Sequence, residues 1–356
     1  MAVPESNRWA SVRMDSASAP SSSRIAVAAS MMRSTGTAGR PRDRWVDRCA
    51  GFEVEVTVSV SLTLDTRHNY GNTVSIMNVR DIDVHSDSQF ATVDGMRIHY
   101  RRSGKGPTVV LLHGSASSLY GVEAVAQRLS PSFDVIRPDL PGFGVTGPRP
   151  DRDYRVTTYA GTLARFLDAI GVGRCAVVGN SLGGNIAWNL ALDHPEHLQL
   201  TGLVLINATG YPDKELPAGM RLARNPVIGQ VLRRFMPRRA VERSLRQAVG
   251  PNSDIVDAAM VDRAHRLWNR PGNRSAFVDF LTTDQPDRSG EIPHISLPTL
   301  VLRSADMDGQ HFTRDIAGSV EKVHPDGGHL LPEEDAAWVA DAVTEFLHSR
   351  AVRNAR

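Results

Sequence analysis

The sequence predicts an α/β fold in which helices cover a mainly parallel β-sheet. From residue 88 onward, short β-rich runs alternate with segments of helical spacing, which is the pattern of strand–helix–strand units. One of these runs, residues 175–178, is apolar on both faces, as is typical of a strand inside a covered parallel sheet. With 356 residues, of which 41% are hydrophobic, the chain can build a sizeable core.

Residues 1–85 are expected to be an extension that is either disordered or the product of a start codon assigned too early. Residues 1–50 are rich in Ser, Ala and Arg and show no apolar periodicity, so they cannot offset the entropy lost on ordering. Their Arg content also fits a transit peptide, although they show no amphipathic helix. Residues 52–64 alternate apolar and polar side chains, which indicates a strand that needs a partner.

The core domain is expected to begin at about residue 86 with a β-hairpin, whose strands at 89–93 and 96–101 are joined by Asp94-Gly95. The later elements are strands at 108–112 and 134–138, a helix at 157–170, strands at 175–178, 203–206, 299–302 and 322–324, and a closing amphipathic helix at 335–348. The core therefore covers 86–210 and 293–350, and residues 351–356 form a tail.

Residues 211–292, between the two parts of the core, are predicted to form a mostly helical insert rich in arginine. Residues 211–290 carry fourteen basic residues against nine acidic ones. This positive charge either attracts carboxylate-bearing substrates or belongs to a solvated helix face. The apolar residues between the arginines either line an acyl pocket or form the core of the insert: Leu222, Val227, Ile228, Val231, Leu232, Phe235 and Met236.

Charge, hydropathy and cysteine content exclude several classes of partner. The net charge is +2, which gives no basic field for a nucleic acid. No apolar run approaches the roughly 18 residues of a membrane helix, so no membrane partner is expected and the protein is assigned to the cytoplasm. The two cysteines, Cys49 and Cys175, provide neither a disulfide framework nor a multi-cysteine metal site. We therefore expect no metal and no cofactor, and a small molecule as the substrate; the oligomeric state stays open.

A candidate nucleophile lies where an apolar strand runs into a helix. The sequence Gly179-Asn180-Ser181-Leu182-Gly183 has the spacing G-x-S-x-G. A turn from strand to helix within a few residues strains the central backbone, and the two glycines remove side chains that would collide there. The turn therefore exposes the Ser181 hydroxyl at the edge of the sheet.

A serine hydroxyl needs a base within hydrogen-bonding reach, and the best candidate is His329, in the loop before the last helix. A carboxylate should orient the imidazole from the end of a strand that lies between these two residues in the sequence. Asp308, followed by Gly309, is the first choice and Asp306 the alternative.

Acyl chemistry also needs two donors for a developing oxyanion. One is expected to be the backbone N–H of Leu182, the residue after the nucleophile. The other is assigned to Ser115, which follows His113-Gly114 in the loop after the strand at 108–112. His113, Gly114 and Asn180 are expected to line the substrate site.

In these motifs the chain resembles the α/β-hydrolase superfamily over about residues 90–350. The resemblance rests on His113-Gly114, on residues 137–144 (Arg-Pro-Asp-Leu-Pro-Gly-Phe-Gly), on the turn at Ser181 and on Gly328-His329. It implies an eight-stranded, mostly parallel α/β-hydrolase sheet flanked by helices, a helical cap inserted after the sixth strand, and a Ser-Asp-His triad. A serine nucleophile differs from the Asp of the haloalkane dehalogenase and epoxide hydrolase branches. Asn180 is similar to the residue before the serine in the meta-cleavage product hydrolases.

The expected function is that of a serine hydrolase that cleaves a small to medium carboxylic ester or lactone through an acyl-enzyme. Ser181 would attack the carbonyl, and His329 would take the proton and return it. One alternative is a carbon–carbon bond hydrolase of the meta-cleavage product type. The other is a ligand receptor that keeps the fold without turnover.

Overall fold

The computed structural model describes residues 27–29, 58–60, 83–193, 195–212, 218–307 and 311–349, and the chain divides into two units, 1–82 and 83–356. In the first unit, strands β1 (Val27–Ala29) and β2 (Val58–Val60) pair antiparallel. β2 lies inside the segment 52–64 that was predicted as a strand. The expectations for the rest of residues 1–82 fall outside the described residues.

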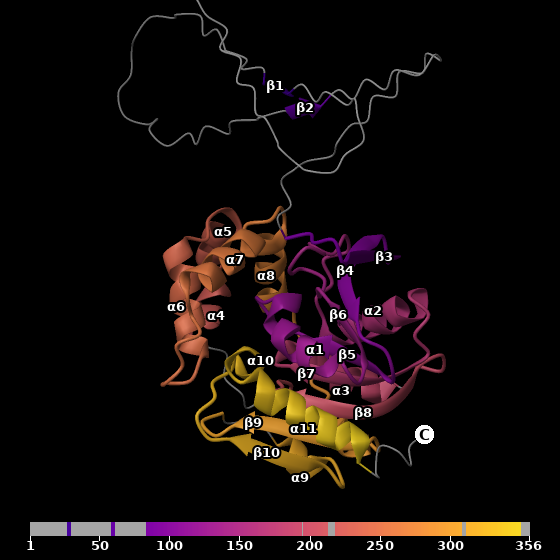
Figure 1. Ribbon diagram of the computed structural model, residues 1–356. Coiled ribbons are helices and arrows are strands. Elements are labelled where there is room, and N and C mark those ends of the chain that lie inside the picture. Colours follow the sequence, from indigo (N-terminus) through magenta and orange to yellow (C-terminus); the bar gives the residue numbers. More distant parts are fainter. Residues whose placement is uncertain are drawn as a thin grey trace, which may run out of the picture. The chain divides into compact units, whose positions relative to one another are not determined.

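The second unit is built on one sheet of eight strands (Figure 1). In chain order the strands are β3 (Ser88–Val93), β4 (Met96–Ser103), β5 (Thr108–Leu112), β6 (Asp134–Pro138), β7 (Arg174–Asn180), β8 (Gln199–Ile206), β9 (Thr299–Ser304) and β10 (Val320–His324). In space their order is β10-β9-β8-β7-β5-β6-β4-β3. β4 runs antiparallel to both of its neighbours and every other pair is parallel, so the predicted fold class is confirmed.

The hairpin at the start of the sheet follows directly from its turn residues. Val93 pairs with Met96, which leaves Asp94 and Gly95 as a two-residue turn. Both have positive φ, 52° and 75°, as a type I′ turn requires. Asn, Asp and Gly are the residues that accept this backbone, so the sequence predicted the hairpin correctly.

Helices cover both faces of the sheet. The four that flank it are α1 (Glu123–Leu129), α2 (Val156–Ala169), α3 (Leu182–Asp193) and α11 (Ala336–His348). The predicted helices at 157–170 and 335–348 correspond to α2 and α11. Asp335 begins α11 because its carboxylate accepts a hydrogen bond from the backbone N–H of Trp338, at 2.9 Å.

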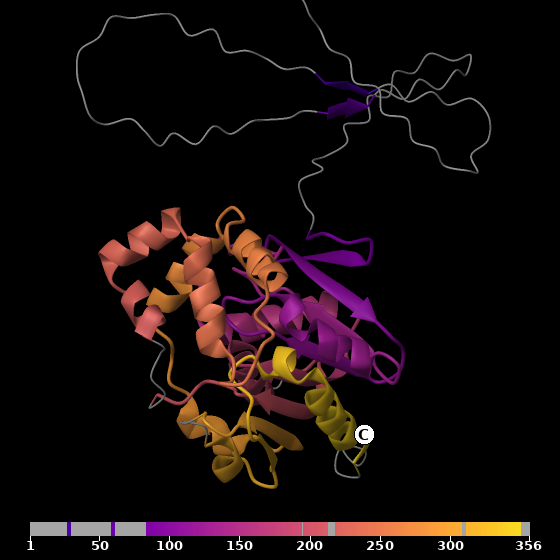
Figure 2. The same cartoon turned by 60° about the vertical axis from the view of Figure 1, so that its left-hand side comes forward.

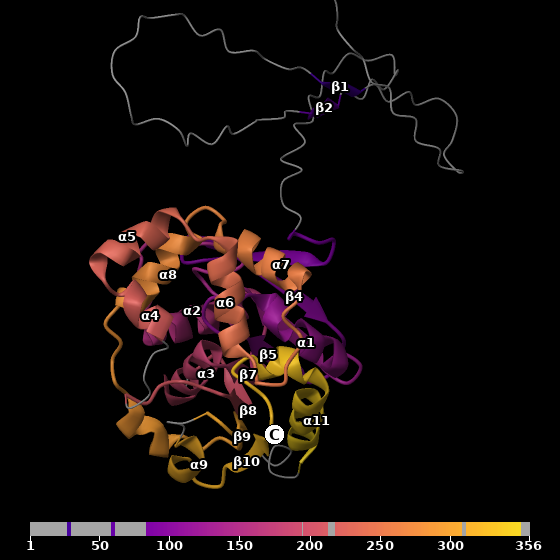
Figure 3. The same cartoon turned by 90° about the vertical axis from the view of Figure 1, so that its left-hand side faces the viewer.

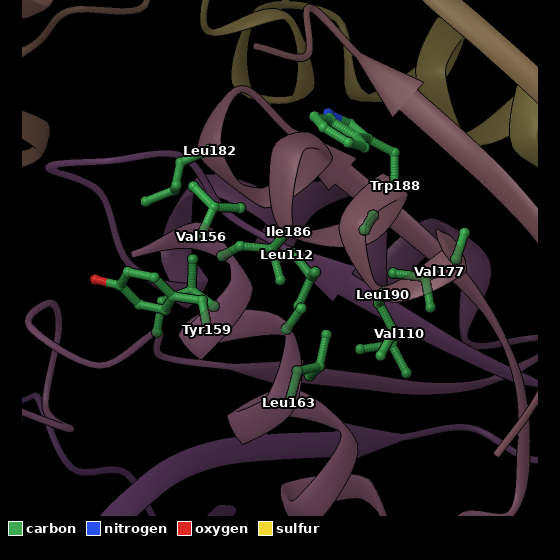
Figure 4. Packing of buried hydrophobic residues seen from close by; sticks show 14 of the residues in the cluster. Val110, Leu112, Val156, Tyr159, Leu163, Val177, Leu182, Ile186, Trp188 and Leu190 are labelled. Carbon is green, nitrogen blue, oxygen red and sulfur yellow. The ribbon is translucent and has the colours of Figure 1, made fainter. Parts of the chain in front are cut away.

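β5 shows why the central strands are apolar on both faces. Val109 and Leu111 point into a core that also contains side chains of α1 and α11. Val110 and Leu112 point the other way, into a second core formed with α2 and α3 (Figure 4). Each buried Val or Leu stabilises the fold by about 1.5–3 kcal/mol, and the two layers hold the ends of β5 and β7 in place.

Between β8 and β9, the sixth and seventh strands of the sheet, the chain forms a group of helices that we call the helical insert. Its members are α4 (Ala218–Ala223), α5 (Pro226–Arg234), α6 (Arg238–Ala248), α7 (Ala258–Trp268) and α8 (Asn273–Thr282). Figures 2 and 3 show them gathered beside the sheet. Asn225 begins α5 by accepting from the N–H of Val227, and Asp257 begins α7 by accepting from that of Met260.

The fate of the insert's apolar residues was open in the sequence, and the structure divides them. Met236 is buried and Leu232 packs against the core. Leu222, Val227, Val231 and Phe235 are exposed, so these four do not form the core of the insert.

Candidate active site

Ser181 stands at the turn between β7 and α3, with its backbone in the left-handed region at φ 54°. Glycine on either side makes the turn possible. A Cβ atom on Gly179 would lie 2.2 Å from the carbonyl oxygen of Gly183, and one on Gly183 would lie 2.5 Å from that of Leu112. No larger residue fits at either position, which explains the G-x-S-x-G spacing physically.

The structure brings His329 to Ser181 across 148 residues of sequence. The Nε2 atom of His329 lies 2.8 Å from the hydroxyl oxygen of Ser181. In the tautomer that carries its proton on Nδ1, the imidazole accepts a hydrogen bond from this hydroxyl. This is the arrangement in which a histidine can remove the proton of an attacking serine.

The loop that carries His329, residues 325–330 between β10 and α10 (Leu331–Glu334), is fixed to the sheet by two polar side chains. The carbonyl of Gly328 accepts from the side-chain N–H of Asn207, at 3.0 Å, and from the hydroxyl of Ser304, at 2.7 Å. Asn207 and Ser304 also bond to each other at the ends of β8 and β9. Both are buried, so the position of His329 is fixed from the carboxyl ends of β8 and β9.

The helical insert holds the same loop from the other side. The carbonyl of Ala248, at the end of α6, accepts from the backbone N–H of His329 at 2.7 Å and of Leu330 at 3.2 Å. The side chain of Leu330 packs against an apolar cluster of the insert that contains Val256 and Met260. The insert therefore makes both polar and apolar contact with the 325–330 loop.

Glu334 connects the loop and the insert through one carboxylate. It accepts from the N–H of Gly328 at 2.9 Å and from the N–H of Gly250 at 2.7 Å. Hydrogen bonds to a carboxylate are stronger than those between neutral groups. Sequence patterns did not indicate a role for Glu334 or Asn207, because the backbone groups that they bind come close to them only in the folded chain.

Two aspartates after β9 were predicted as the carboxylate partner of His329. Asp306 is an exposed residue just after β9. Asp308, the first choice, lies outside the described residues. The assignment of the acid therefore stays a prediction.

The loop of residues 113–116 lies beside Ser181. His113 is buried, and its Nε2 accepts from the N–H of Leu140 at 2.9 Å while its Nδ1 donates to the carbonyl of Gly114 at 2.7 Å. Burial lowers the pKa of His113, which favours this neutral, doubly bonded form. His113 thus holds the loop rather than offering a free nitrogen to a ligand.

Gly114 brings the 113–116 loop against the candidate nucleophile. A Cβ atom on Gly114 would lie 3.2 Å from the Cβ of Ser181 and 3.5 Å from the side-chain nitrogen of Asn180. The backbone of the next residue, Ser115, is therefore at the edge of the site, as is that of Leu182, which follows Ser181. Asn180 itself is buried, and its Oδ1 makes no hydrogen bond to any described residue.

The helical insert also touches the 113–116 loop. The indole N–H of Trp268, the last residue of α7, donates to the carbonyl of Ala116 at 3.0 Å. Ala116 has a positive φ of 60°. Trp268 packs on Phe277 with ring centroids 4.5 Å apart, which fixes the indole. The sequence did not single out Trp268, because a lone aromatic in a helix carries no positional signal.

Asp139 is a further residue whose role the sequence left unassigned. Its buried carboxylate accepts from the N–H of Leu119 at 2.7 Å and of Val145 at 2.8 Å, and from Nδ1 of His99 at 2.7 Å. Burial alone would raise the pKa of Asp139, but the hydrogen bond and charge of His99 hold it below its usual value. Leu119 lies three residues after the 113–116 loop, so Asp139 fixes the chain where it leaves that loop. The motif at 137–144 was the available signal.

Comparison with known proteins agrees with this geometry. A family model described as the alpha/beta hydrolase family matches residues 109–342. The 2-hydroxy-6-oxononadienedioate/2-hydroxy-6-oxononatrienedioate hydrolase of Burkholderia vietnamiensis is 32% identical over 279 residues, which cover 71% of this chain and 91% of the relative.

Two further similarities extend over most of the chain. The hydrolase YugF of Bacillus subtilis is 26% identical, with coverage of 72% of this chain and 96% of its own. Among solved structures, Est816, described as an N-acyl homoserine lactone degrading enzyme, is 25% identical with a TM-score of 0.60 and covers 72% of this chain and 100% of its own. The sheet order, the strained serine turn and the family match agree, and the chain belongs to the alpha/beta hydrolase family and is a hydrolase.

Proposed function

We propose that this hydrolase cleaves a small to medium carboxylic ester or lactone by way of a serine acyl-enzyme. The observation that carries the proposal is the 2.8 Å contact between the Ser181 hydroxyl and Nε2 of His329, at the tip of a strained turn. A serine placed in this way against a histidine can become a nucleophile near neutral pH.

In the proposed reaction Ser181 attacks the carbonyl carbon while His329 takes the hydroxyl proton. The oxyanion is received by the backbone N–H groups of Leu182 and Ser115, each of which contributes about 3 kcal/mol in such sites. His329 then gives the proton to the leaving alcohol, and a water molecule releases the acyl group by the same steps. Asp308, with Asp306 as the alternative, orients the imidazole.

We further propose that the helical insert, with its connecting segments (residues 211–292), is a cap over this site. Ala248 binds the 325–330 loop and Trp268 binds the 113–116 loop, so the insert contacts the two segments that border Ser181. A body that contacts both borders is positioned to exclude water and to select substrates.

Two observations favour an ester or lactone over other substrates. Est816, which degrades a lactone by its description, matches along its whole length. Leu330 follows His329 at a position where the meta-cleavage product hydrolases usually have Trp, and this leucine packs into the apolar cluster of the insert.

The second candidate is a carbon–carbon bond hydrolase of the meta-cleavage type. The relative from Burkholderia vietnamiensis supports it, since the match covers 91% of that enzyme. Asn180, buried beside Gly114 with its carbonyl oxygen unbonded among the described residues, is the chemical feature in its favour.

The decisive experiment combines labelling with a fluorophosphonate and turnover of p-nitrophenyl esters from acetate to decanoate. Ser181→Ala should abolish labelling and lower turnover by roughly 10⁴-fold or more. Ser130→Ala, remote from the site at the end of α1, is the matched control and should behave as wild type. Asp306→Asn and Asp308→Asn are tested side by side. The one that lowers turnover by about 10⁴-fold identifies the acid.

The same panel separates the candidates. If the wild type labels but turns over only dienone ring-cleavage products, which absorb visible light, the carbon–carbon hydrolase replaces the esterase. If it labels slowly and turns over neither class, the protein acts as a ligand receptor. If Ser181→Ala retains ester turnover, the site itself is assigned wrongly.

A further inference from the structure

The helical insert carries an unusual concentration of exposed apolar side chains. Seven large hydrophobic residues are exposed in the part of the chain that the structure describes, and four of them fall within fourteen positions of α4, α5 and the residue that ends α5. These four are Leu222 at 57% exposure, Val227 at 74%, Val231 at 55% and Phe235 at 62%. Scattered exposed apolar residues need no explanation, but a cluster marks an interaction surface.

The geometry of α5 shows that the exposure is directional. Gly229 faces inward, where a Cβ atom would lie 3.2 Å from the Cγ1 of Val278 on α8. Val227 and Val231 are four residues apart and lie on the opposite side of the helix. Figures 1 and 3 both place α5 at the outer edge of the insert, away from the sheet. The outward face of α5 therefore exposes Val227 and Val231 to solvent.

The same stretch of sequence is rich in arginine, and several of its arginines have no acidic partner among the described residues. Residues 218–246 contain eight arginines and one acid, Glu242. Arg233 pairs with Asp279, whereas Arg224, Arg234 and Arg239 are exposed and form no ion pair with a described residue. We call the set of Leu222, Val227, Val231, Phe235, Arg224, Arg234 and Arg239 the insert patch.

Apolar side chains flanked by unpaired cations are complementary to an anionic lipid surface. The apolar groups can enter the boundary between headgroups and acyl chains, while the guanidinium groups bind lipid phosphates. Side chains that are more than half exposed project from the protein rather than line a groove, which suits a fluid surface better than a shaped protein partner. None of the described helices is long and apolar enough to cross a bilayer.

We propose that the insert patch docks the protein on the surface of an anionic membrane, with α5 lying in the plane of the interface. The absence of a spanning segment had given no reason to expect a membrane, but a peripheral contact requires only such a helix face. The proposal is independent of the ester or lactone assignment, because no patch residue belongs to the candidate site.

The test is co-sedimentation of the full chain with vesicles of phosphatidylcholine alone or of phosphatidylcholine mixed with phosphatidylglycerol. Binding is expected only to the mixed vesicles, and it should weaken as salt rises because the charges are screened. The triple change Val227→Ser, Val231→Ser and Phe235→Ser should lower the partition coefficient at least about tenfold. Arg224→Gln, Arg234→Gln and Arg239→Gln together should lower it on the order of a hundredfold.

Matched controls come from other exposed surfaces of the same chain. Val320→Ser with Val323→Ser removes exposed valines of β10, and Arg128→Gln removes an exposed arginine of α1; both should bind as wild type. Circular dichroism should show all variants folded, with unchanged turnover of any soluble ester that the wild type hydrolyses.

Three results would overturn the proposal. The first is that the wild type stays in the supernatant with mixed vesicles at low salt, and the second is that the control variants lose binding as much as the patch variants. The third is a dimer in solution that the apolar triple change converts to a monomer, without vesicle binding, which would make a second copy of the chain the occupant.

Discussion

Asp139 keeps its charge inside the protein because three donors converge on it. Two are backbone N–H groups from segments twenty residues before it and six after it, and the third is the His99 ring. Gly144 makes room for this carboxylate, since a Cβ atom there would lie 2.1 Å from its carbon. One side chain therefore ties β4 to the segments that contain Leu119 and Val145.

Replacing Asp139 with Asn should destabilise the protein by about 3 kcal/mol, because it removes one partner of a buried charged network. The pKa of Asp139 is lowered in the folded state, so its ionised form stabilises the fold above the usual pKa of 3.8 and this contribution is lost as pH falls through the lowered value. Urea unfolding should thus show a large difference from wild type at neutral pH and a smaller one in strong acid.

Asp168→Asn is the control for this comparison. Asp168 is exposed on α2 and forms no ion pair with a described residue, so its replacement should change the stability by less than about 0.5 kcal/mol. If Asp139→Asn proved as stable as Asp168→Asn, the role given to Asp139 would be wrong.

Glu333 provides the opposite pH dependence. Burial raises its pKa to about 7, with neighbouring Glu334 adding to the effect and Arg263 opposing it. Because the folded pKa lies above the usual 4.5, the protonated form is favoured in the folded state, and stability should fall as pH rises from about 4.5 through about 7. Glu333→Gln should remove this fall, measured as the unfolding temperature at a series of pH values. Asp341→Asn, at an exposed site on α11, should leave it in place.

At the scale of elements, periodicity predicted the core accurately and the surface of the insert poorly. The runs at 108–112 and 134–138 correspond to β5 and β6 residue for residue, and α2 is displaced by one residue from its prediction. β5 and β6 are buried on both faces and α2 along one face, so the apolar pattern of each sequence matches the burial of its side chains. In the insert, Met236 and Phe235 are both apolar neighbours, yet one is buried and the other exposed. Which of the two is buried depends on the helices that pack against this segment, and the local sequence pattern does not predict that packing.

The candidate site divides in the same way. Ser181 and His329 were identifiable because a strained turn and a donor–acceptor chemistry each require a particular residue type. Asn207, Glu334 and Trp268 were not, because they act on backbone groups far away in sequence. The choice between Asp306 and Asp308 as the acid that orients His329 stays a prediction.

Trp268→Phe tests the contact between α7 and the 113–116 loop. The change keeps the aromatic packing on Phe277 but removes the hydrogen bond to Ala116. A hydrogen bond of this kind is worth about 1 kcal/mol, so kcat/KM for an ester substrate should fall roughly fivefold, with little change in the unfolding temperature. Trp338→Phe on α11 is the control and should leave kcat/KM unchanged. Equal kinetics for both variants would show that the loop needs no support from the insert.

At the scale of the whole molecule, Glu334 joins the helical insert to the sheet-borne 325–330 loop. Glu334→Gln keeps the size of the side chain, but an amide has a single acceptor oxygen, so one of the two hydrogen bonds is lost and the other loses its charge assistance. We expect kcat to fall about tenfold with a smaller change in KM, since the base is displaced while the substrate pocket remains. Steady-state kinetics at several pH values, beside the exposed control Glu196→Gln, would measure this. A change in KM alone would contradict a role in positioning His329.

The double hydrogen bond at Ala248 couples the position of the helical insert to the position of His329. Its carbonyl holds the backbone of His329 and Leu330, so any movement that lifts the end of α6 from the sheet also releases the proton acceptor of Ser181. If the insert opens as the proposed cap, the open molecule would therefore hold Ser181 without its proton acceptor. Reagents small enough to enter without such a movement would meet an assembled site at all times, whereas bulky ones would meet it only after reclosure.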